Sequence, residues 1–195
     1  MTFSHSVGRG KVGKRILVRT SIFIVWIGLL TGSWACSKPL ANTPKTVEQV
    51  DLDRYKGLWY EIARIPNRFQ KHCVEGVTAH YSFDKSGQIA VINRCLESDG
   101  NYDEAKGVAR IVDTRSNAKL EVSFVSIFGN PIFWGAYWII DLGSSYEFAI
   151  VGHPQRKYGW ILSRRPKMEK KQLESLFSIL KSQGYSPSDF VMTKH

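Results

Sequence analysis

From residue 57 onward, apolar and polar positions alternate in short runs that are rich in β-branched and aromatic residues. Eight such runs follow one another, at 58–65, 74–83, 88–95, 103–112, 118–126, 135–142, 146–152 and 158–164. A period of two is typical of β-strands. Turn-forming residues separate the runs, for example at 84–87 and 142–145, which is compatible with antiparallel pairing of neighbours. The pattern therefore predicts eight consecutive antiparallel strands.

A helical period appears late in the chain, at 167–183. Four apolar residues share one face of that segment: Leu173, Leu176, Phe177 and Leu180. Pro166 precedes the segment and Gly184 follows it, as expected for the two ends of a helix. No helix of crossover length separates two strands, which excludes a parallel α/β sheet. We expect the helix to cover the outside of the sheet, with a short ninth strand near 190–192.

Eight paired strands form either a sandwich or a closed barrel, and closure removes the exposed edges that invite aggregation. We therefore expect an all-β fold, an eight-stranded antiparallel up-and-down barrel with one C-terminal α-helix packed outside. On the inner face, Gly107 and Ala109 either leave room for a ligand or accommodate bulky neighbours in a packed core. Asn93 on the same face favours room for a ligand, because an apolar core rarely buries an amide without a partner.

The N-terminal segment follows another order: basic, apolar, then small residues. Five basic residues precede the apolar run 21–30, and small residues are frequent in 31–35. The run is too short to span a hydrocarbon core of ~30 Å. A retained membrane anchor beginning at Ile16 would place Arg19 within the span. The order is typical of a secretory signal, and we expect residues 1–35 to be a signal peptide.

The string Leu30–Cys36 resembles the cleavage site of bacterial lipoproteins, in which the cysteine becomes lipidated and is the new N-terminus. The resemblance implies a fatty-acylated Cys36. By the same resemblance, Ser37 implies transfer to the outer membrane, with the domain facing the periplasm. Residues 36–50 contain two prolines and no apolar period, as a tether does. The predicted organisation is signal peptide 1–35, tether 36–50 and barrel domain 51–195.

Charge changes this picture little. The formal net charge is +10, but the first 35 residues hold five basic residues and no acid. From residue 36 onward, 22 basic and 17 acidic residues leave a charge of +5. Such a mildly basic surface lacks the concentrated basic stripe that phosphate neutralisation needs, so we expect no nucleic-acid partner.

The segment Gly57–Arg64, GLWYEIAR, resembles the opening strand of a lipocalin. In that family a Gly-x-Trp motif places the tryptophan at the closed base of the barrel. The flanking segments 53–55 and 65–69 are similar to the branch that contains bacterial outer-membrane lipocalins, apolipoprotein D and plant temperature-induced lipocalins. Further matches lie at 78–82, 91–93, 119–124 and 160–164, so that the resemblance covers about 51–193.

The resemblance implies roles for particular residues. In the family, the arginine that ends the last barrel strand, here Arg164, lies over the tryptophan, here Trp59, and a cation on an indole face contributes ~0.5 to 2 kcal/mol. Both are expected to be structural. The ligand-lining positions of relatives correspond to Tyr55, Tyr81, Asn93, Phe124, Tyr137 and Trp160. Glu61 shares a face with Trp59, and both an inward and an exposed position remain open.

Aromatic side chains with polar tips suit an amphiphile with a long chain and a polar head. We therefore expect a lipid-binding lipoprotein. Its cavity would carry or store a fatty acid, lysophospholipid or similar small hydrophobic ligand near the membrane that anchors it.

Catalytic constellations are absent from the sequence. His72, His80 and His153 lie on separate predicted elements, and no metal-ligand spacing, nucleophile elbow or glycine-rich phosphate loop occurs. We expect no catalytic residue, no metal and no cofactor. The alternative is a lipocalin-type isomerase or synthase that acts on a bound lipid through Cys95.

Cys73 and Cys95 share the parity of the inner positions and lie at the outer ends of the hairpin that turns at 84–87. Export to an oxidising compartment would allow them to form a disulfide. A straight ladder with Phe83 opposite Gln88 places Cys95 opposite position 76 rather than 73, beyond bonding reach. The sequence thus predicts either a disulfide that requires a bulge or two free thiols.

Overall fold

The computed structural model describes residues 43–84 and 88–195. The expected signal peptide, Cys36 and the first part of the expected tether lie outside these residues. The elements in chain order are α1 (Leu52–Tyr55), β1 (Gly57–Arg64), η1 (Arg68–Gln70), β2 (Cys73–Phe83), β3 (Ile89–Glu97), β4 (Tyr102–Ile111), β5 (Lys119–Ser123), β6 (Val125–Ile127), β7 (Asn130–Ile132), β8 (Gly135–Leu142), β9 (Phe148–Gly152), β10 (Gly159–Ser163), α2 (Lys170–Ser182), η2 (Pro187–Asp189) and β11 (Val191–Met192).

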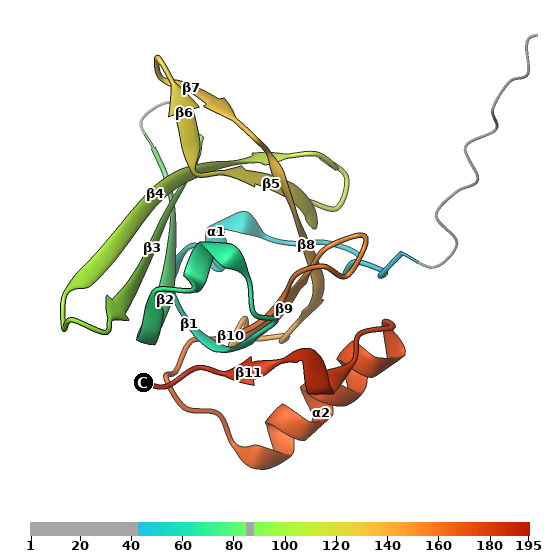
Figure 1. Cartoon of the computed structure of the whole chain (residues 1–195). Helices are drawn as coiled ribbons and strands as arrows, with labels where there is room; N and C mark the ends of the chain where they lie inside the picture. Colours follow the sequence, from blue (N-terminus) through green and yellow to red (C-terminus); the bar gives the residue numbers. More distant parts are fainter. Residues whose placement is uncertain (1–42, 85–87) are drawn as a thin grey trace, which may run out of the picture. The chain divides into compact units, whose positions relative to one another are not determined.

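Eight of these strands close into a barrel. Their order is β10-β9-β8-β5-β4-β3-β2-β1, and β1 pairs back to β10, with every pairing antiparallel. β11 adds to β1, while β6 and β7 form a separate hairpin. Figure 1 shows the ring of strands. The predicted barrel is confirmed, and the β6–β7 hairpin is an addition that the sequence pattern did not predict.

Because neighbouring strands run in opposite directions, the connections gather at two ends of the barrel. We call the end where β1 finishes the mouth and the end where it begins the base. The mouth holds the connections 65–72, 98–101, 124–134 and 153–158. The base holds 51–56, 112–118 and 143–147.

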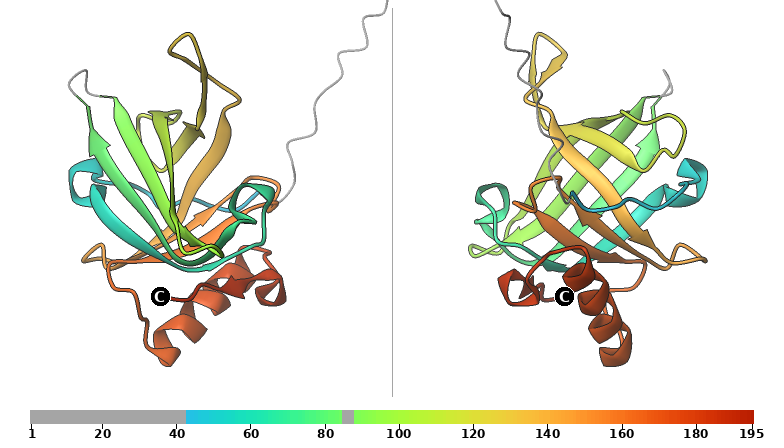
Figure 2. Two further views of the ribbon diagram at one scale, coloured as in Figure 1. Left: turned by 60° about the vertical axis from the view of Figure 1, so that its left-hand side comes forward. Right: turned by 90° about the vertical axis from the view of Figure 1, so that its right-hand side faces the viewer.

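The alternation of side chains along the strands produces two apolar cores. The inner core contains Trp59, Val91 and Leu120. The outer core lies between the barrel wall and α2, where Ile150 and Ile161 meet Leu176 and Leu180, all essentially inaccessible to solvent. Both views in Figure 2 show α2 lying against the outside of the barrel, as predicted.

The helix begins three residues later than the pattern predicts and ends at a glycine cap. Gly184 has a φ of +83°, and the Tyr185 N–H donates to the Leu180 carbonyl while the Gly184 N–H donates to that of Lys181. These two bonds form a Schellman motif, which terminates the helix. Among the residues that the structure describes, no helix is long and apolar enough to cross a membrane.

Residues 43–50, from the expected tether, lie along the barrel. The Val47 N–H donates to the Ile139 carbonyl at 3.0 Å, and the Val50 N–H donates to that of Ser116 at 2.7 Å. The side chain of Val50 is buried in the inner core. Contacts of the barrel domain therefore begin before residue 51.

Candidate ligand-binding site

The base of the barrel is sealed by a stacked pair. Trp59 is fully buried, and its Nε1 donates to the Tyr55 carbonyl at 2.8 Å. The Arg164 guanidinium lies 3.8 Å from the Trp59 ring centroid and donates to the carbonyls of Leu58, Arg54, Tyr55 and Tyr146. Burial lowers the pKa of Arg164. With its donors used on backbone carbonyls, this arginine closes the base and offers no binding site of its own.

Three tyrosines from three elements meet inside the barrel. The Tyr137 hydroxyl, on β8, hydrogen-bonds to that of Tyr55, at the end of α1, at 2.9 Å and to that of Tyr81, on β2, at 2.8 Å. Burial raises the pKa of Tyr81 to about 12 and raises the pKa values of Tyr55 and Tyr137 well above the ordinary range. The three hydroxyls are therefore neutral hydrogen-bonding groups at physiological pH.

Tyr55, Tyr81 and Tyr137 line one cavity of about 20 Å³, room for roughly one water molecule. The rest of its lining is mostly apolar: Leu52, Lys56, Ser82, Phe83, Ile89, Ala109, Leu120 and Val122. Three of the six residues expected to line the ligand site thus share one cavity, which we call the tyrosine cavity.

The other three expected ligand residues lie outside the lining of the tyrosine cavity. Asn93 lies on β3 between its cross-strand partners Ala79 and Ala105, and its amide makes no hydrogen bond to any residue in 43–84 or 88–195. The half-exposed Phe124 follows β5, and a Cβ added to Gly107 would lie 2.6 Å from its ring. At this position, then, the small residue accommodates a bulky neighbour instead of leaving room.

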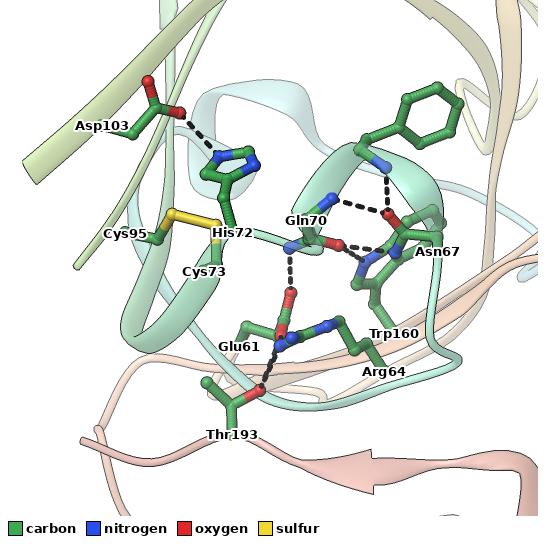
Figure 3. The surroundings of a disulfide bond; sticks show 11 residues. Glu61, Arg64, Asn67, Gln70, His72, Cys73, Cys95, Asp103, Trp160 and Thr193 are labelled. Carbon is green, nitrogen blue, oxygen red and sulfur yellow. Dashed lines mark hydrogen bonds and ion pairs between the residues drawn. A yellow bond between two sulfur atoms is a disulfide. The ribbon is translucent and has the colours of Figure 1, made fainter. Parts of the chain in front are cut away.

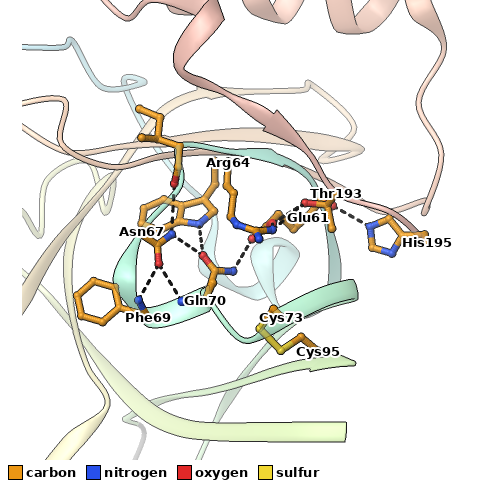
Figure 4. A network of polar contacts seen from close by, with 11 residues as sticks. Glu61, Arg64, Asn67, Phe69, Gln70, Cys73, Cys95, Thr193 and His195 are labelled. Carbon is orange, nitrogen blue, oxygen red and sulfur yellow. Dashed lines mark hydrogen bonds and ion pairs between the residues drawn. A yellow bond between two sulfur atoms is a disulfide. The ribbon is translucent and has the colours of Figure 1, made fainter. Parts of the chain in front are cut away.

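Trp160, on β10, is held by a polar network at the mouth, and Figure 4 shows its members Glu61, Asn67 and Gln70. Its Nε1 donates to the Gln70 Oε1 at 3.1 Å, and the Asn67 amide donates to the same oxygen at 2.7 Å. The Gln70 amide in turn donates to Glu61 at 2.6 Å. The segment 65–72 is thereby tied to the last barrel strand.

Glu61 is the buried centre of that network, with 3% of its surface exposed. Its carboxylate also accepts from Arg64 Nη1 and from the Thr193 hydroxyl, each at 2.6 Å. A buried carboxylate requires such partners, because desolvation without them is costly. Of the two positions left open by the sequence, Glu61 adopts the buried one. In the sequence, the position of Glu61 two residues after Trp59 was the signal for its burial. Nothing in the sequence pattern indicated that Gln70 and Thr193 would be its partners.

Cys73 and Cys95 form a disulfide with a Cα–Cα distance of 5.4 Å (Figure 3). Phe83 pairs with Ile89 and not with Gln88, one residue away from the expected register. Two register shifts between residues 73 and 78, where Gly76 has a φ of +64°, then bring Cys73 to Cys95. Cys95 consequently has no free thiol, so the isomerase or synthase alternative lacks its nucleophile.

A closed antiparallel barrel with a sealed base and an aromatic interior defines a class of proteins that hold one small ligand. A family model described as a lipocalin-like domain matches residues 50–195, and the chain belongs to the lipocalin family. It is 37% identical to the "Outer membrane lipoprotein Blc" of Escherichia coli (strain K12) over 159 residues, which cover 80% of this chain and 86% of the relative.

Other relatives come from plants and mammals. The chain is 35% identical to "Temperature-induced lipocalin-1" of Arabidopsis thaliana, with 74% of this chain and 78% of the relative covered. It is 34% identical to mouse "Apolipoprotein D", with 73% and 75% covered. Among solved structures, insecticyanin from the tobacco hornworm Manduca sexta superposes with a TM-score of 0.63 at 23% identity, covering 78% of this chain and 84% of insecticyanin. That last similarity shows the fold alone.

Proposed function

We propose that this lipocalin carries or stores a fatty acid, a lysophospholipid or a similar small amphiphile, without covalent chemistry. The observation that carries the proposal is the interior of the barrel, where three neutral hydroxyls meet an apolar lining above a sealed base. Such an interior suits a long apolar chain and supplies a few hydrogen bonds to fix it.

An acyl chain needs far more room than the tyrosine cavity offers. Phe124 is the side chain whose movement would supply it. The ring is 39% exposed at the mouth and lies over Gly107, beside the small residues of β4. Rotation of this ring toward solvent would free the space over Gly107, so we propose that Phe124 is displaced when the ligand enters.

The mouth carries an apolar surface that favours contact with lipid. In the β6–β7 hairpin, Phe128 is 99% exposed and Phe133 is 82% exposed. Both have positive φ values, 49° and 57°, a strained conformation for aromatic residues that is typical of functional segments. No charged residue occurs in 122–140. Exposed aromatic side chains without nearby charge on the same hairpin suit insertion into a lipid surface.

The proposed position of the protein is the outer membrane, with Cys36 lipidated and the barrel on the periplasmic side. The Escherichia coli relative is named an outer membrane lipoprotein, and the sequence around Cys36 supports the same attachment here. Metabolic labelling with a radioactive fatty acid tests this step. We expect label in the wild type and none in Cys36→Ala, and equal label in both would contradict lipidation at Cys36.

Ligand binding is tested by fluorescence titration of the purified, delipidated chain with a long-chain fatty acid, alongside native mass spectrometry of lipid retained from the cell. We expect micromolar affinity and an approximately tenfold loss in Trp160→Ala, equivalent to about 1.4 kcal/mol. Trp138→Ala is the matched control, because Trp138 lies in the outer core and should leave affinity unchanged. Failure of every hydrophobic ligand to bind in the micromolar range would overturn the carrier proposal.

Lipid contact at the mouth is tested separately by co-sedimentation with vesicles of mixed phosphatidylethanolamine and phosphatidylglycerol, using the chain with Cys36→Ala. Phe128→Asp should reduce the bound fraction several-fold. Val112→Asp is the control, since Val112 is an exposed apolar residue at the opposite end of the barrel. Equal binding by the two variants would contradict a lipid-facing mouth.

A further inference from the structure

Outside the tyrosine cavity, three side chains of metal-ligating type gather beside the disulfide. They are His72, Glu97 and Asp103, and their ligand atoms all lie within 4.8 Å of one another. The His72 Nε2 lies 3.0 Å from the Asp103 Oδ2. Figure 3 shows His72 and Asp103 next to the Cys73–Cys95 bond. The cluster combines an imidazole with two carboxylates at the mouth of the barrel.

The strand register explains why these residues meet. His72 immediately precedes Cys73, and Cys73 pairs with Glu97 across the β2–β3 ladder. Cys95 pairs with Asp103 across the β3–β4 ladder. The disulfide therefore fixes the backbone beside each of the three side chains. A cluster held in this way loses little conformational freedom when it binds an ion, which favours affinity.

Charge points to a cation as the ligand. The Glu97 carboxylate makes no hydrogen bond or ion pair with another residue in the described part of the chain, and the partner of the Asp103 carboxylate there is His72. Two carboxylates this close repel each other, and one imidazole cannot neutralise both. A divalent ion would neutralise the pair and use the imidazole nitrogen as a third ligand.

We propose that His72, Glu97 and Asp103 bind a divalent first-row transition metal, with Zn²⁺ as the ion that best matches the ligands. One imidazole nitrogen and two carboxylate oxygens are ordinary zinc ligands, and water completes the coordination. The ion would join the start of β2, the end of β3 and the start of β4 at the mouth. The site is separate from the tyrosine cavity, so the proposal does not depend on lipid binding.

Calorimetric titration of the chelator-treated, full-length chain in detergent with zinc chloride tests the site. We expect one ion per chain with a dissociation constant in the micromolar range. His72→Ala, Asp103→Asn and Glu97→Gln should each weaken binding about tenfold or more. His80→Ala is the matched control, because His80 is an exposed imidazole on β2, the strand that follows His72, and belongs to no metal-ligating group among the described residues. Its affinity should equal that of the wild type.

Thermal denaturation supplies a second readout that reports folding as well. In the presence of a metal chelator, the variants should unfold near the temperature at which the wild type unfolds, because the side chains of His72, Glu97 and Asp103 are at least partly exposed. Added Zn²⁺ should raise the midpoint of the wild type and of His80→Ala, but not that of His72→Ala, since an ion that binds only the folded state stabilises it. No binding at millimolar Zn²⁺, or unchanged binding in both His72→Ala and Asp103→Asn, would overturn the proposal.

Discussion

The two ends of the barrel use aromatic residues in opposite ways. At the base, Trp59 is fully buried, covered by Arg164, and its indole N–H is hydrogen-bonded. At the mouth, Phe128 and Phe133 are almost entirely exposed and lie in strained backbone. Because burial of apolar surface stabilises and exposure does not, the base holds the fold together. The mouth keeps apolar surface available for contact with a ligand or a membrane.

The two ends of the barrel also differ in the partners of their charged side chains. Arg164 at the base forms no ion pair with a carboxylate in 43–84 or 88–195, and it donates to backbone carbonyls of several segments, so its contacts require one particular arrangement of the chain. At the mouth, Glu61 is paired with Arg64 and linked to Trp160 through Gln70. The base is thus organised by backbone contacts, and the mouth by side chains that reach one another across loops.

The largest expected contrast comes from removing one aromatic ring at each end. Trp59→Ala should lower the free energy of unfolding by ~3 to 5 kcal/mol, because a large buried side chain leaves a cavity. Phe128→Ala should change it by less than ~0.5 kcal/mol, since the ring is exposed. Urea denaturation of the two variants measures both values. Similar losses in the two variants would abolish the distinction between base and mouth.

The next largest effect concerns the Cys73–Cys95 disulfide at the mouth. The disulfide joins residues 22 positions apart. The double variant Cys73→Ser/Cys95→Ser should lose ~2 to 4 kcal/mol, because the unfolded chain regains the freedom of that loop. Thermal denaturation of the wild type with a reductant should reproduce the loss. A reduced wild type that melts at the oxidised temperature would show that the link contributes no stability.

Arg164→Ala should lower stability by ~1 to 3 kcal/mol, from the lost cation–π contact and hydrogen bonds. The folded fraction should still bind ligand, since this arginine closes the base without lining the tyrosine cavity. Arg115→Ala is the control, because Arg115 is another arginine near the base, with 96% of its side chain exposed and one distant ion pair. Guanidinium denaturation compares the two, and an unchanged midpoint in Arg164→Ala would refute the structural role.

The last effect is absent near neutral pH and appears only in alkaline solution. The pKa of Tyr81 rises from 10.0 to about 12 on burial. Between these values the unfolded state loses the proton first, so stability falls as pH rises, by up to ~1.4 kcal/mol per pH unit for this group. Tyr81→Phe should make the fall shallower. Tyr102→Phe, a change of an exposed tyrosine, controls for the substitution itself. Identical pH slopes in both variants would contradict the raised pKa.

Much of the fold could be predicted from local pattern. The alternating runs predicted each barrel strand to within a few residues, because a period of two follows from strand geometry at every position. The apolar face of 173–180 predicted α2 and the side it buries. The β6–β7 hairpin was not predicted, because its turns contain two phenylalanines with positive φ. Aromatic residues rarely adopt that backbone conformation, so these two residues give no signal of a turn.

By itself, the sequence determined the order of the eight barrel strands and of the helix that follows them and, through a motif shared with a known family, the residues that close the base. The tertiary structure alone decided how those residues meet across strands. A bulge near Gly76 brings Cys73 to Cys95, and the strand pairing on either side of the disulfide gathers Glu97 of β3, Asp103 of β4 and His72 from the turn before β2. The ring of Phe124 occupies the space over Gly107. Local geometry depends on neighbours along the chain, whereas register and packing depend on residues that the chain brings together only when the barrel closes.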